Sequence, residues 1–394
     1  MFKFPTAAAA LLAASAAAVM AQTGPAPSPV PAAASESNPD AVVAAAEARA
    51  VATQLAAQLE TTYVFPDIAR RYAESLRAKA GGGAYDEVGT RGALAERLTA
   101  DLRAVSPDNH LRVLAGRPGP GGPGPRRVVV RAGGDGSAGA AQPRPAPMAR
   151  PEAVEQARWV APGVAFVRLN LFPGSPEVVE AARKFMTDHS EAKTIIFDIR
   201  THRGGGLAEM DAMFPYLFAK PTTLVTMDTR ASVDRERGNP AGDAMLRKVP
   251  TKEDVVRREH YVTPHASEKR LFGAKVFVLT SNFTGSAAEH FALSLKRTKR
   301  ATLIGEATGG AGHYGGFQPV GEHFSVFIPV GRTFDPDTGK GWETVGVPPD
   351  IAVPAERALY EALVRSGVAP AEAERLSEEL KPSGPMRRPQ PRQG

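Results

Sequence analysis

Ser286 occupies a position in the sequence where a serine hydroxyl could act as a nucleophile. It follows an apolar, β-branched run, 276–279, that predicts a buried strand, and it opens a stretch, 286–297, whose apolar residues share one helical face. Helix starts leave backbone N–H groups unpaired and favour negative charge, which suits a nucleophile with oxyanion donors beside it. Ser286 and Glu289 also form an S-x-x-E capping box, so a purely structural role as a helix cap is the alternative.

A serine nucleophile needs a base that takes its proton, a group that orients the base, and donors for the developing oxyanion. In an α/β sheet such groups gather at strand ends and in the loops that follow. Candidates at such places are His110 for the base, Glu343 or Asn109 for the orienting group, and the backbone N–H groups of Gly205 and Ala287 for the donors.

Each candidate also has a structural interpretation. His110 fits a structural loop residue, the glycine run 204–206 a tight turn, and Glu343 a solvated carboxylate. Three further histidines compete as the base, without support from their surroundings, namely His202, His290 and His313. No metal site or cofactor is expected, because the histidines are dispersed, H-E-x-x-H is absent, and no Rossmann or P-loop glycine pattern occurs between a strand and a helix.

Strand and helix patterns alternate in the second half of the chain and predict an α/β fold with a largely parallel sheet covered on both faces. The expected strands are 164–169, 193–200, 276–279 and 301–304, and the expected helices are 175–190, 207–218 and 286–297. Residues 223–227 are expected as an edge strand, 228–269 as mostly exposed connection, and 357–380 as a helix. Nearer the N-terminus, three helix-forming stretches predict a small bundle: 41–59, 67–80 and 90–105.

The first 21 residues have the features of a secretory signal. Lys3 supplies the positive start, Ala7–Val19 the apolar stretch, and Ala21 ends a small-residue cleavage site. Export to the periplasm or the medium is therefore expected, without a membrane span. The chain has no cysteine, which excludes a disulfide and a lipid-modified cysteine at the cleavage site.

Composition bounds the remaining organisation. The net charge of +6 comes from scattered arginines without an aromatic-interleaved basic patch, so nucleic-acid binding is not expected. The sequence gives no information on the oligomeric state. The expected division is a signal peptide (1–21), a disordered lead-in (22–40), a helical bundle (41–115), a Gly/Pro-rich flexible insertion (116–157), an α/β catalytic domain (158–355), and a C-terminal helix with a disordered tail (356–394).

Five motifs together resemble the tail-specific protease superfamily. They are LTADLRAVSPDNHLRV, IIFDIRTHRGGG, VLTSNFTGSAAEHFA, RATLIGEATGG and IPVGRTFDPDTGKGWETVGVPPDI. The resemblance covers roughly Ala41–Val353, less the insertion, and is closest to the bacterial branch related to interphotoreceptor retinoid-binding protein and to the tricorn protease core. It implies an N-terminal helical bundle joined to an α/β core shared with the crotonase and Clp-protease folds, and serine peptidase chemistry on peptide or protein substrates.

The resemblance also implies roles for single residues. Ser286 matches the nucleophile, His110 the base, Glu343 the acid, and Gly205 and Ala287 the oxyanion donors. Asn109 stands where tricorn-like enzymes keep a serine that hydrogen-bonds within the triad, which leaves that supporting role open.

Two departures from the family pattern refine the prediction. Tail-specific proteases proper use a Ser–Lys pair, but Ala311 stands at the lysine's position, which favours a Ser–His–Glu arrangement. The segment between His110 and Trp159 cannot build the core of a PDZ-type module. We therefore predict an exported serine peptidase. The alternative is a non-catalytic binder of hydrophobic, retinoid- or fatty-acid-like ligands on the same scaffold, and a weaker one is a peptide-docking module.

Overall fold

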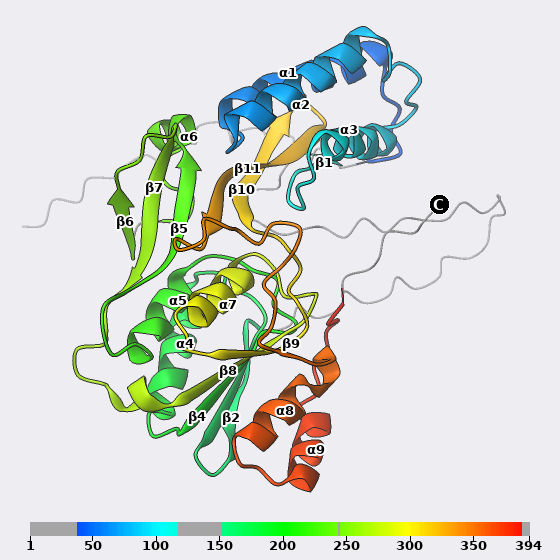
Figure 1. Ribbon diagram of the computed structural model, residues 1–394. Helices are drawn as coiled ribbons and strands as arrows, with labels where there is room; N and C mark the ends of the chain where they lie inside the picture. Colours follow the sequence, from blue (N-terminus) through cyan, green and yellow to red (C-terminus); the bar gives the residue numbers. More distant parts are fainter. Residues whose placement is uncertain (1–37, 117–151, 243–244, 388–394) are drawn as a thin grey trace, which may run out of the picture. The chain divides into compact units, whose positions relative to one another are not determined.

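A computed structural model describes residues 38–116, 152–242 and 245–387 (Figure 1). The expected signal peptide, nearly all of the lead-in, most of the Gly/Pro-rich insertion and the end of the C-terminal tail lie outside these residues. Within them, no helix is both long enough and apolar enough to cross a membrane.

Three helices precede the sheets, as the sequence predicted. They are α1 (Ala45–Thr62), α2 (Pro66–Gly81) and α3 (Arg91–Val105). Proline is well placed at the first position of α2, and the Thr90 side chain accepts the N–H of Ala93 to cap α3. Leucines on one side of each helix, among them Leu55, Leu76 and Leu98, are fully buried in a core that the bundle shares with strand β11 (Phe324–Phe334). This core fixes the chain that leaves α3 toward the candidate site.

A six-stranded sheet in the described chain is parallel except at one edge, with strand order β12-β9-β8-β4-β3-β2. Its strands are β2 (Val154–Ala161), β3 (Val164–Leu169), β4 (Thr194–Asp198), β8 (Lys275–Thr280), β9 (Thr302–Gly305) and β12 (Ile351–Ala352). β3 and β4 are buried along their whole lengths, as their near-continuous apolar runs predict. β2 begins within the segment expected as a flexible insertion, because Val154 pairs with Leu169 of β3.

Helices cover both faces of the parallel sheet, which confirms the predicted α/β class (Figure 1). One face packs against α4 (Pro176–Asp188), α5 (Ala208–Met213) and α7 (Ala287–Arg297), and the other against α8 (Ala358–Arg365) and α9 (Pro370–Glu379). Short 3₁₀ helices are η1 (Phe214–Tyr216), η2 (Arg270–Gly273) and η3 (Ala355–Arg357). The single helix expected at 357–380 is thus wrong: Gly367 adopts a positive φ of 91°, and Pro370 starts a new helix.

A second, antiparallel sheet of six strands has the order β1-β11-β5-β7-β6, with β10 also paired to β11. Its strands are β1 (Arg112–Ala115), β5 (Thr222–Arg230), β6 (Leu246–Val249), β7 (Val255–Val262), β10 (His313–Val320) and β11 (Phe324–Phe334), and α6 (Ala231–Arg237) follows β5.

Two sequence predictions fail in this sheet. Residues 223–227, expected at an edge, lie in β5 between β11 and β7, and the span 228–269 contains α6, β6 and β7 instead of mostly exposed connection. The polar composition of residues 228–269 suggested exposed connection, but these charged side chains form ion pairs between neighbouring strands. Asp228 is fully buried between Arg257 of β7, at 2.7 Å, and Arg332 of β11, at 2.9 Å. Paired in this way, charged residues can occupy a strand interior.

Candidate active site

Ser286 lies in a strained turn between β8 and α7. Its φ of 57° and ψ of −120° are unusual for a residue with a side chain, and such strain is typical of functional turns. The preceding loop is tied to the end of the neighbouring strand β4, because the Ser281 hydroxyl donates to the Arg200 carbonyl at 2.6 Å and the Thr284 hydroxyl to the Ile199 carbonyl at 2.8 Å. These bonds hold the Ser286 turn against the glycine loop that follows β4.

The glycine loop passes directly beside the Ser286 turn. A Cβ atom on Gly204 would lie 2.7 Å from the Cβ of Ser286 and 3.3 Å from the backbone nitrogen of Ala287, so only glycine permits this approach. Gly204 and Gly206 bond to the backbone of Phe172, whereas within the described chain no partner takes the N–H of Gly205 or of Ala287. The two N–H groups that the sequence predicts as oxyanion donors, of Gly205 and Ala287, are therefore both unpaired, and they belong to segments that lie beside each other.

His202 supports this loop and is not a candidate base. It is fully buried, and burial lowers its pKa to about 3, so the ring is neutral. Its Nδ1 accepts the N–H of Gly204 at 2.9 Å, and its carbonyl accepts the N–H of Gly285 at 3.1 Å. His202 thus joins the two loops, with its ring on the glycine loop and its backbone carbonyl on the Ser286 loop. The sequence showed only a histidine within THRGGG and did not indicate this contact.

His110 lies between α3 and β1, stacked on Phe327 with ring centroids 5.3 Å apart. Asp108 fixes its backbone by accepting the N–H of His110 at 2.8 Å and that of Leu111 at 3.0 Å. Nδ1 of His110 is buried without a hydrogen-bond partner, and the nearest carboxylate oxygen, Oε2 of Glu343, is 3.9 Å away. The structure therefore brings the expected base and the expected acid together, at a separation longer than a hydrogen bond.

Glu343 is a half-buried carboxylate with several donors. Its Oε1 accepts the N–H of Asn109 at 2.7 Å, and its Oε2 accepts those of Gly312 at 2.6 Å and His313 at 3.0 Å. Burial raises its pKa, but the adjacent His110 ring, the charge of His313 and the Asn109 N–H outweigh burial and hold the pKa below its usual value. Glu343 is thus ionised at neutral pH, contrary to the interpretation as a solvated surface carboxylate.

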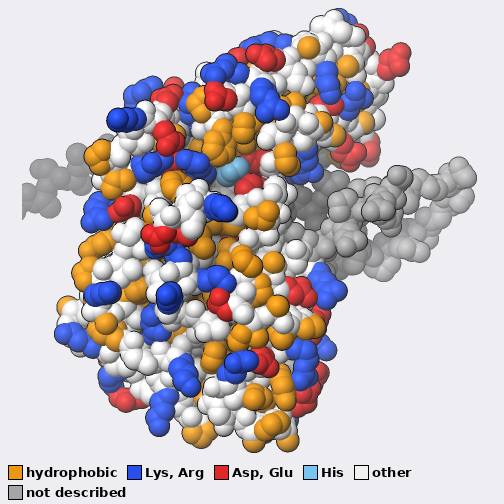
Figure 2. Space-filling view, in the orientation of Figure 1, with side chains coloured by type: hydrophobic (Ala, Val, Ile, Leu, Met, Phe, Trp, Pro, Cys, Tyr) orange, Lys and Arg blue, Asp and Glu red, His pale blue; other side chains and the backbone are white. Residues whose placement is uncertain are grey.

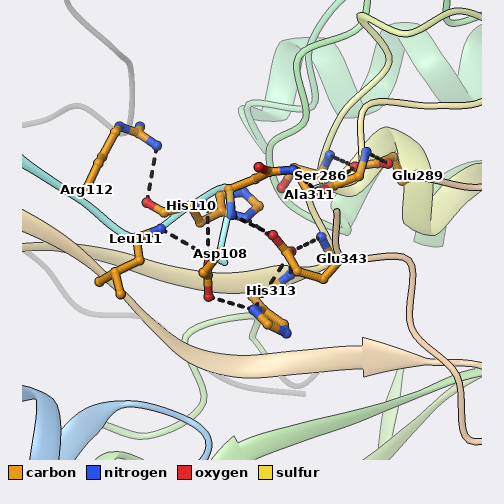
Figure 3. A network of polar contacts seen from close by, with 12 residues as sticks. Asp108, His110, Leu111, Arg112, Ser286, Glu289, Ala311, His313 and Glu343 are labelled. Atoms are coloured by element: carbon orange, nitrogen blue, oxygen red, sulfur yellow. Dashed lines mark hydrogen bonds and ion pairs between the residues drawn. The ribbon is translucent and has the colours of Figure 1, made fainter. Parts of the chain in front are cut away.

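A hydrogen-bonded path runs from the backbone N–H of Ser286 to the acid, Glu343, by way of Asn109, the residue before His110. Figure 3 shows its beginning at Ser286, Glu289 and Ala311. The buried Glu289 carboxylate accepts the N–H groups of Ser286, Gly310 and Ala311 and the Thr308 hydroxyl, at 2.6–2.8 Å. The Gly310 carbonyl in turn accepts the side-chain amide of Asn109 at 2.6 Å. The capping glutamate therefore also clamps the loop after β9. Among the described contacts, no hydrogen bond joins the Ser286 hydroxyl to the His110 ring directly.

A second histidine completes the network, and the sequence gave no reason to select it. Nδ1 of His313 lies 2.7 Å from Oδ2 of Asp108 and 3.8 Å from Oε2 of Glu343, and the Tyr63 hydroxyl donates to the same Asp108 oxygen at 2.9 Å. Asp108, His313 and Glu343 offer ligand atoms within 4.8 Å of one another, as a metal site would. Their oxygens are already occupied by N–H and O–H donors, so we assign a hydrogen-bonded network and no metal.

The remaining candidates lie elsewhere. His290 is buried in α7, where its Nε2 contacts Nδ1 of His260 at 2.8 Å, and burial holds its pKa well below the usual value. Lys296, a lysine in the last turn of α7 that could be considered as a base for Ser286, pairs with Asp350 at 2.6 Å. Ala311, at the position of a catalytic lysine in Ser–Lys relatives, donates its N–H to Glu289.

On the face drawn in Figure 2, a histidine side chain reaches the surface over β10 and β11, among hydrophobic, basic and acidic side chains.

Comparisons with known proteins agree with this architecture. Residues 163–353 match the family model of peptidase family S41, and residues 40–131 match the N-terminal domain of peptidase S41 in eukaryotic IRBP. The chain belongs to peptidase family S41. The two matches together span well over half of the chain, and they confirm the predicted resemblance to the branch related to interphotoreceptor retinoid-binding protein.

Several solved structures are similar to this chain. The photosystem II D1 C-terminal processing protease aligns with a TM-score of 0.50 and 16% identity, over 83% of this chain and 99% of that chain. A lipoprotein from Streptococcus agalactiae aligns with a TM-score of 0.45 and 11% identity, over 82% and 97%. Mature CPAF complexed with lactacystin aligns with a TM-score of 0.38 and 15% identity, over 55% of this chain and 51% of that chain, so this chain spans about half of CPAF's length.

Proposed function

We propose that this S41 family member is a serine-type peptidase that uses Ser286, His110 and Glu343. The observation that carries the proposal is the strained Ser286 turn with two unpaired N–H groups, of Gly205 and Ala287, in the segments that meet there. A serine that served only as a helix cap would need neither the strain nor a second unpaired N–H, that of Gly205, from a separate segment beside it. Membership in a peptidase family supports peptides or proteins as the substrate class.

Each residue has one role in the proposed reaction. The Ser286 hydroxyl attacks the carbonyl carbon, His110 accepts its proton at Nε2, and Glu343 stabilises the resulting imidazolium through Nδ1–H. The N–H groups of Gly205 and Ala287 donate to the oxyanion. His110 then gives the proton to the leaving amine, and water releases the acyl group by the same steps in reverse. The 3.9 Å between His110 and Glu343 must shorten for this, a change typical of substrate binding.

Asn109 acts as a positioning residue in this proposal. Its backbone N–H holds Glu343, and its side chain holds the Gly310 carbonyl, which fixes the loop that Glu289 clamps to the Ser286 turn. A Ser–Lys mechanism is not supported, since Ala311 offers no amine and Lys296 is engaged by Asp350. The family match does not favour the hydrophobic-ligand binder.

We also propose export with cleavage after Ala21, which N-terminal sequencing of the secreted protein would test.

The experiment is labelling of the full-length mature chain by a fluorophosphonate probe, which forms a bond only with an activated serine. Wild-type protein should label, and Ser286→Ala and His110→Ala should lose labelling on the order of 10⁶-fold, the range for removing a nucleophile or base. Ser366→Ala and His323→Ala are matched controls away from the site and should label normally. Folded wild-type protein that does not label, or undiminished labelling of Ser286→Ala, would contradict the proposal.

A further inference from the structure

Two imidazoles lie at nearly equal distances from one carboxylate oxygen. Oε2 of Glu343 is 3.9 Å from Nδ1 of His110 and 3.8 Å from Nδ1 of His313. Only His110 can serve the proposed triad, because His313 belongs to strand β10 and points its Nδ1 at Asp108. A mechanism that needs the His110–Glu343 bond must therefore keep the second imidazole from forming a bond with the same oxygen.

Asp108 is the group that engages His313. Burial raises the pKa of Asp108, but His313 and the N–H groups of Leu111 and His110 outweigh burial, so the carboxyl is ionised at neutral pH. Nδ1 of His313 must then carry the hydrogen of the 2.7 Å contact. The hydroxyl of Tyr63, the residue that follows α1, donates a further hydrogen bond to Asp108. Asp108 is almost completely buried.

We propose that Asp108 is a positioning residue for the triad: by holding Nδ1–H of His313, it keeps the second imidazole off Glu343 and leaves that carboxylate for His110. The inference rests on the proposed function, since it concerns the same three catalytic groups. Asp108 does not touch the substrate or the reacting atoms. It acts on His110 through two backbone N–H groups and on Glu343 through His313.

The charges around His313 support this assignment. Asp108 and Glu343 are the carboxylates that face its ring, and the Tyr63 hydroxyl donates to the same Asp108 oxygen that His313 contacts. The Phe65 ring packs against His313 with ring centroids 5.4 Å apart. Arg332 is its cross-strand partner, but that guanidinium is paired with Asp228. An Nδ1–H of His313 that lost Asp108 would find its nearest carboxylate acceptor in Glu343.

Substitution of Asp108 and His313, singly and together, tests the inference. Asp108→Asn keeps an oxygen for the two backbone N–H groups but presents an amide donor to Nδ1–H of His313, which should turn the ring toward Glu343. We expect the maximal labelling rate with the fluorophosphonate probe to fall about 100-fold, the cost of a misplaced catalytic group, with the probe's binding constant unchanged. His313→Phe removes the competing donor and keeps the packing against Phe65, so it should label at nearly the wild-type rate.

The double variant decides between positioning and mere support of the fold. Asp108→Asn with His313→Phe should regain most of the wild-type labelling rate, because no second imidazole is left to compete. Recovery would establish the competition. Three results would overturn it. The double variant could label no faster than Asp108→Asn, Asp108→Asn could label as fast as wild type, or His313→Phe could label as slowly as Asp108→Asn. Asp101→Asn, at another buried carboxylate that accepts a tyrosine hydroxyl, controls for stability. Wild-type protein that did not label would instead contradict the proposed function.

Discussion

The two sides of the candidate site are built in different ways. The serine side comprises Ser286, Ala287 and Gly205, and the histidine side comprises Asp108, His110, His313 and Glu343. The serine side lies on the ends of β4 and β8, which are neighbours in one parallel sheet, so their following loops meet as a consequence of the sheet. The histidine side joins segments that are up to 234 positions apart and share no single element.

The polar groups of the two sides differ in the same way. Two N–H groups of the serine side have no partner in the described residues, and the turn that presents them is strained. On the histidine side, by contrast, the oxygens of Asp108 and Glu343 all accept hydrogen bonds. A backbone scaffold can keep donors open for a substrate, whereas side chains from separate elements must be fixed by satisfying one another.

Among substitutions that leave the proposed catalytic side chains in place, the largest effect is expected from adding a side chain to the open part of the serine side. A Cβ on Gly205, whose φ is 131°, would lie 1.9 Å from the carbonyl oxygen of Phe172, so the loop must move and its N–H with it. We expect Gly205→Ala to lower the fluorophosphonate labelling rate roughly 100- to 1,000-fold, the range for a lost oxyanion donor. It should also lower the free energy of unfolding by about 2 kcal/mol through backbone strain.

The neighbouring glycine provides the matched control. A Cβ on Gly206 would lie 3.9 Å from the same oxygen, an ordinary contact, so Gly206→Ala should label and unfold like wild type. If Gly205→Ala labelled at the wild-type rate, the donors of the serine side would not include Gly205. The measurements are the labelling rates and the urea unfolding curves of Gly205→Ala and Gly206→Ala.

The serine side was also the more predictable side from the sequence. A buried strand, a polar loop and an amphipathic helix follow one another within residues 275–297, and each has a local pattern that indicates it. THRGGG follows a second apolar run of the same kind, and neighbouring parallel strands place their ends together. Ser286, Gly205 and Ala287 could therefore be selected as a group without knowledge of a distant contact.

The histidine side could be predicted only in part, from positions at strand ends and from the family resemblance. His110 and Glu343 were selected, but Asp108 was given no role, and His313 was named only as a competing base without support from its surroundings. Their contact depends on the pairing of β1 and β10 with β11 in the antiparallel sheet, which the sequence analysis did not anticipate. Contacts across 205 positions leave no periodic signal in either segment.

The contributions of the two sides to the stability of the fold should also change with pH in opposite directions. The pKa of Glu343 is lowered by its neighbours, whereas burial raises that of Glu289, beside Ser286, despite its four donors. A lowered pKa contributes stability that is present above the usual value of 4.5 and is lost as the pH falls through the folded value. A raised pKa contributes stability that is present below 4.5 and is lost as the pH rises through the folded value.

Paired glutamine substitutions test this contrast. From pH 4 to pH 7, the wild type's advantage in free energy of unfolding over Glu343→Gln should grow, reaching about 2 kcal/mol for a charged acceptor of several N–H groups. Over the same range its advantage over Glu289→Gln should shrink, because the wild-type carboxyl loses its favourable protonated form. Urea unfolding at several pH values gives both differences. If both advantages changed in the same direction, the two carboxylates would not differ as described.

The smallest effect is expected where the helical bundle meets the histidine side. Tyr63 donates to Asp108 at 2.9 Å, and Tyr85, within the bundle, donates to Asp101 at 3.0 Å. Both tyrosines are buried, and burial raises the pKa of each, so both hydroxyls stay protonated and donate. Tyr63→Phe and Tyr85→Phe each remove one hydrogen bond from a buried carboxylate and should each cost about 1 kcal/mol in the free energy of unfolding.

Only Tyr63→Phe should also reach the candidate site. Asp108 keeps His313 and two backbone N–H groups after the hydroxyl is lost, so the labelling rate should fall by at most about 5-fold, the factor that corresponds to roughly 1 kcal/mol. Tyr85→Phe should label at the wild-type rate, because Asp101 contacts none of the proposed catalytic groups in the described structure. Equal labelling of the two variants would mean that the bundle supports the fold without tuning the histidine side. A selective loss in Tyr63→Phe would connect the bundle to the triad through Asp108.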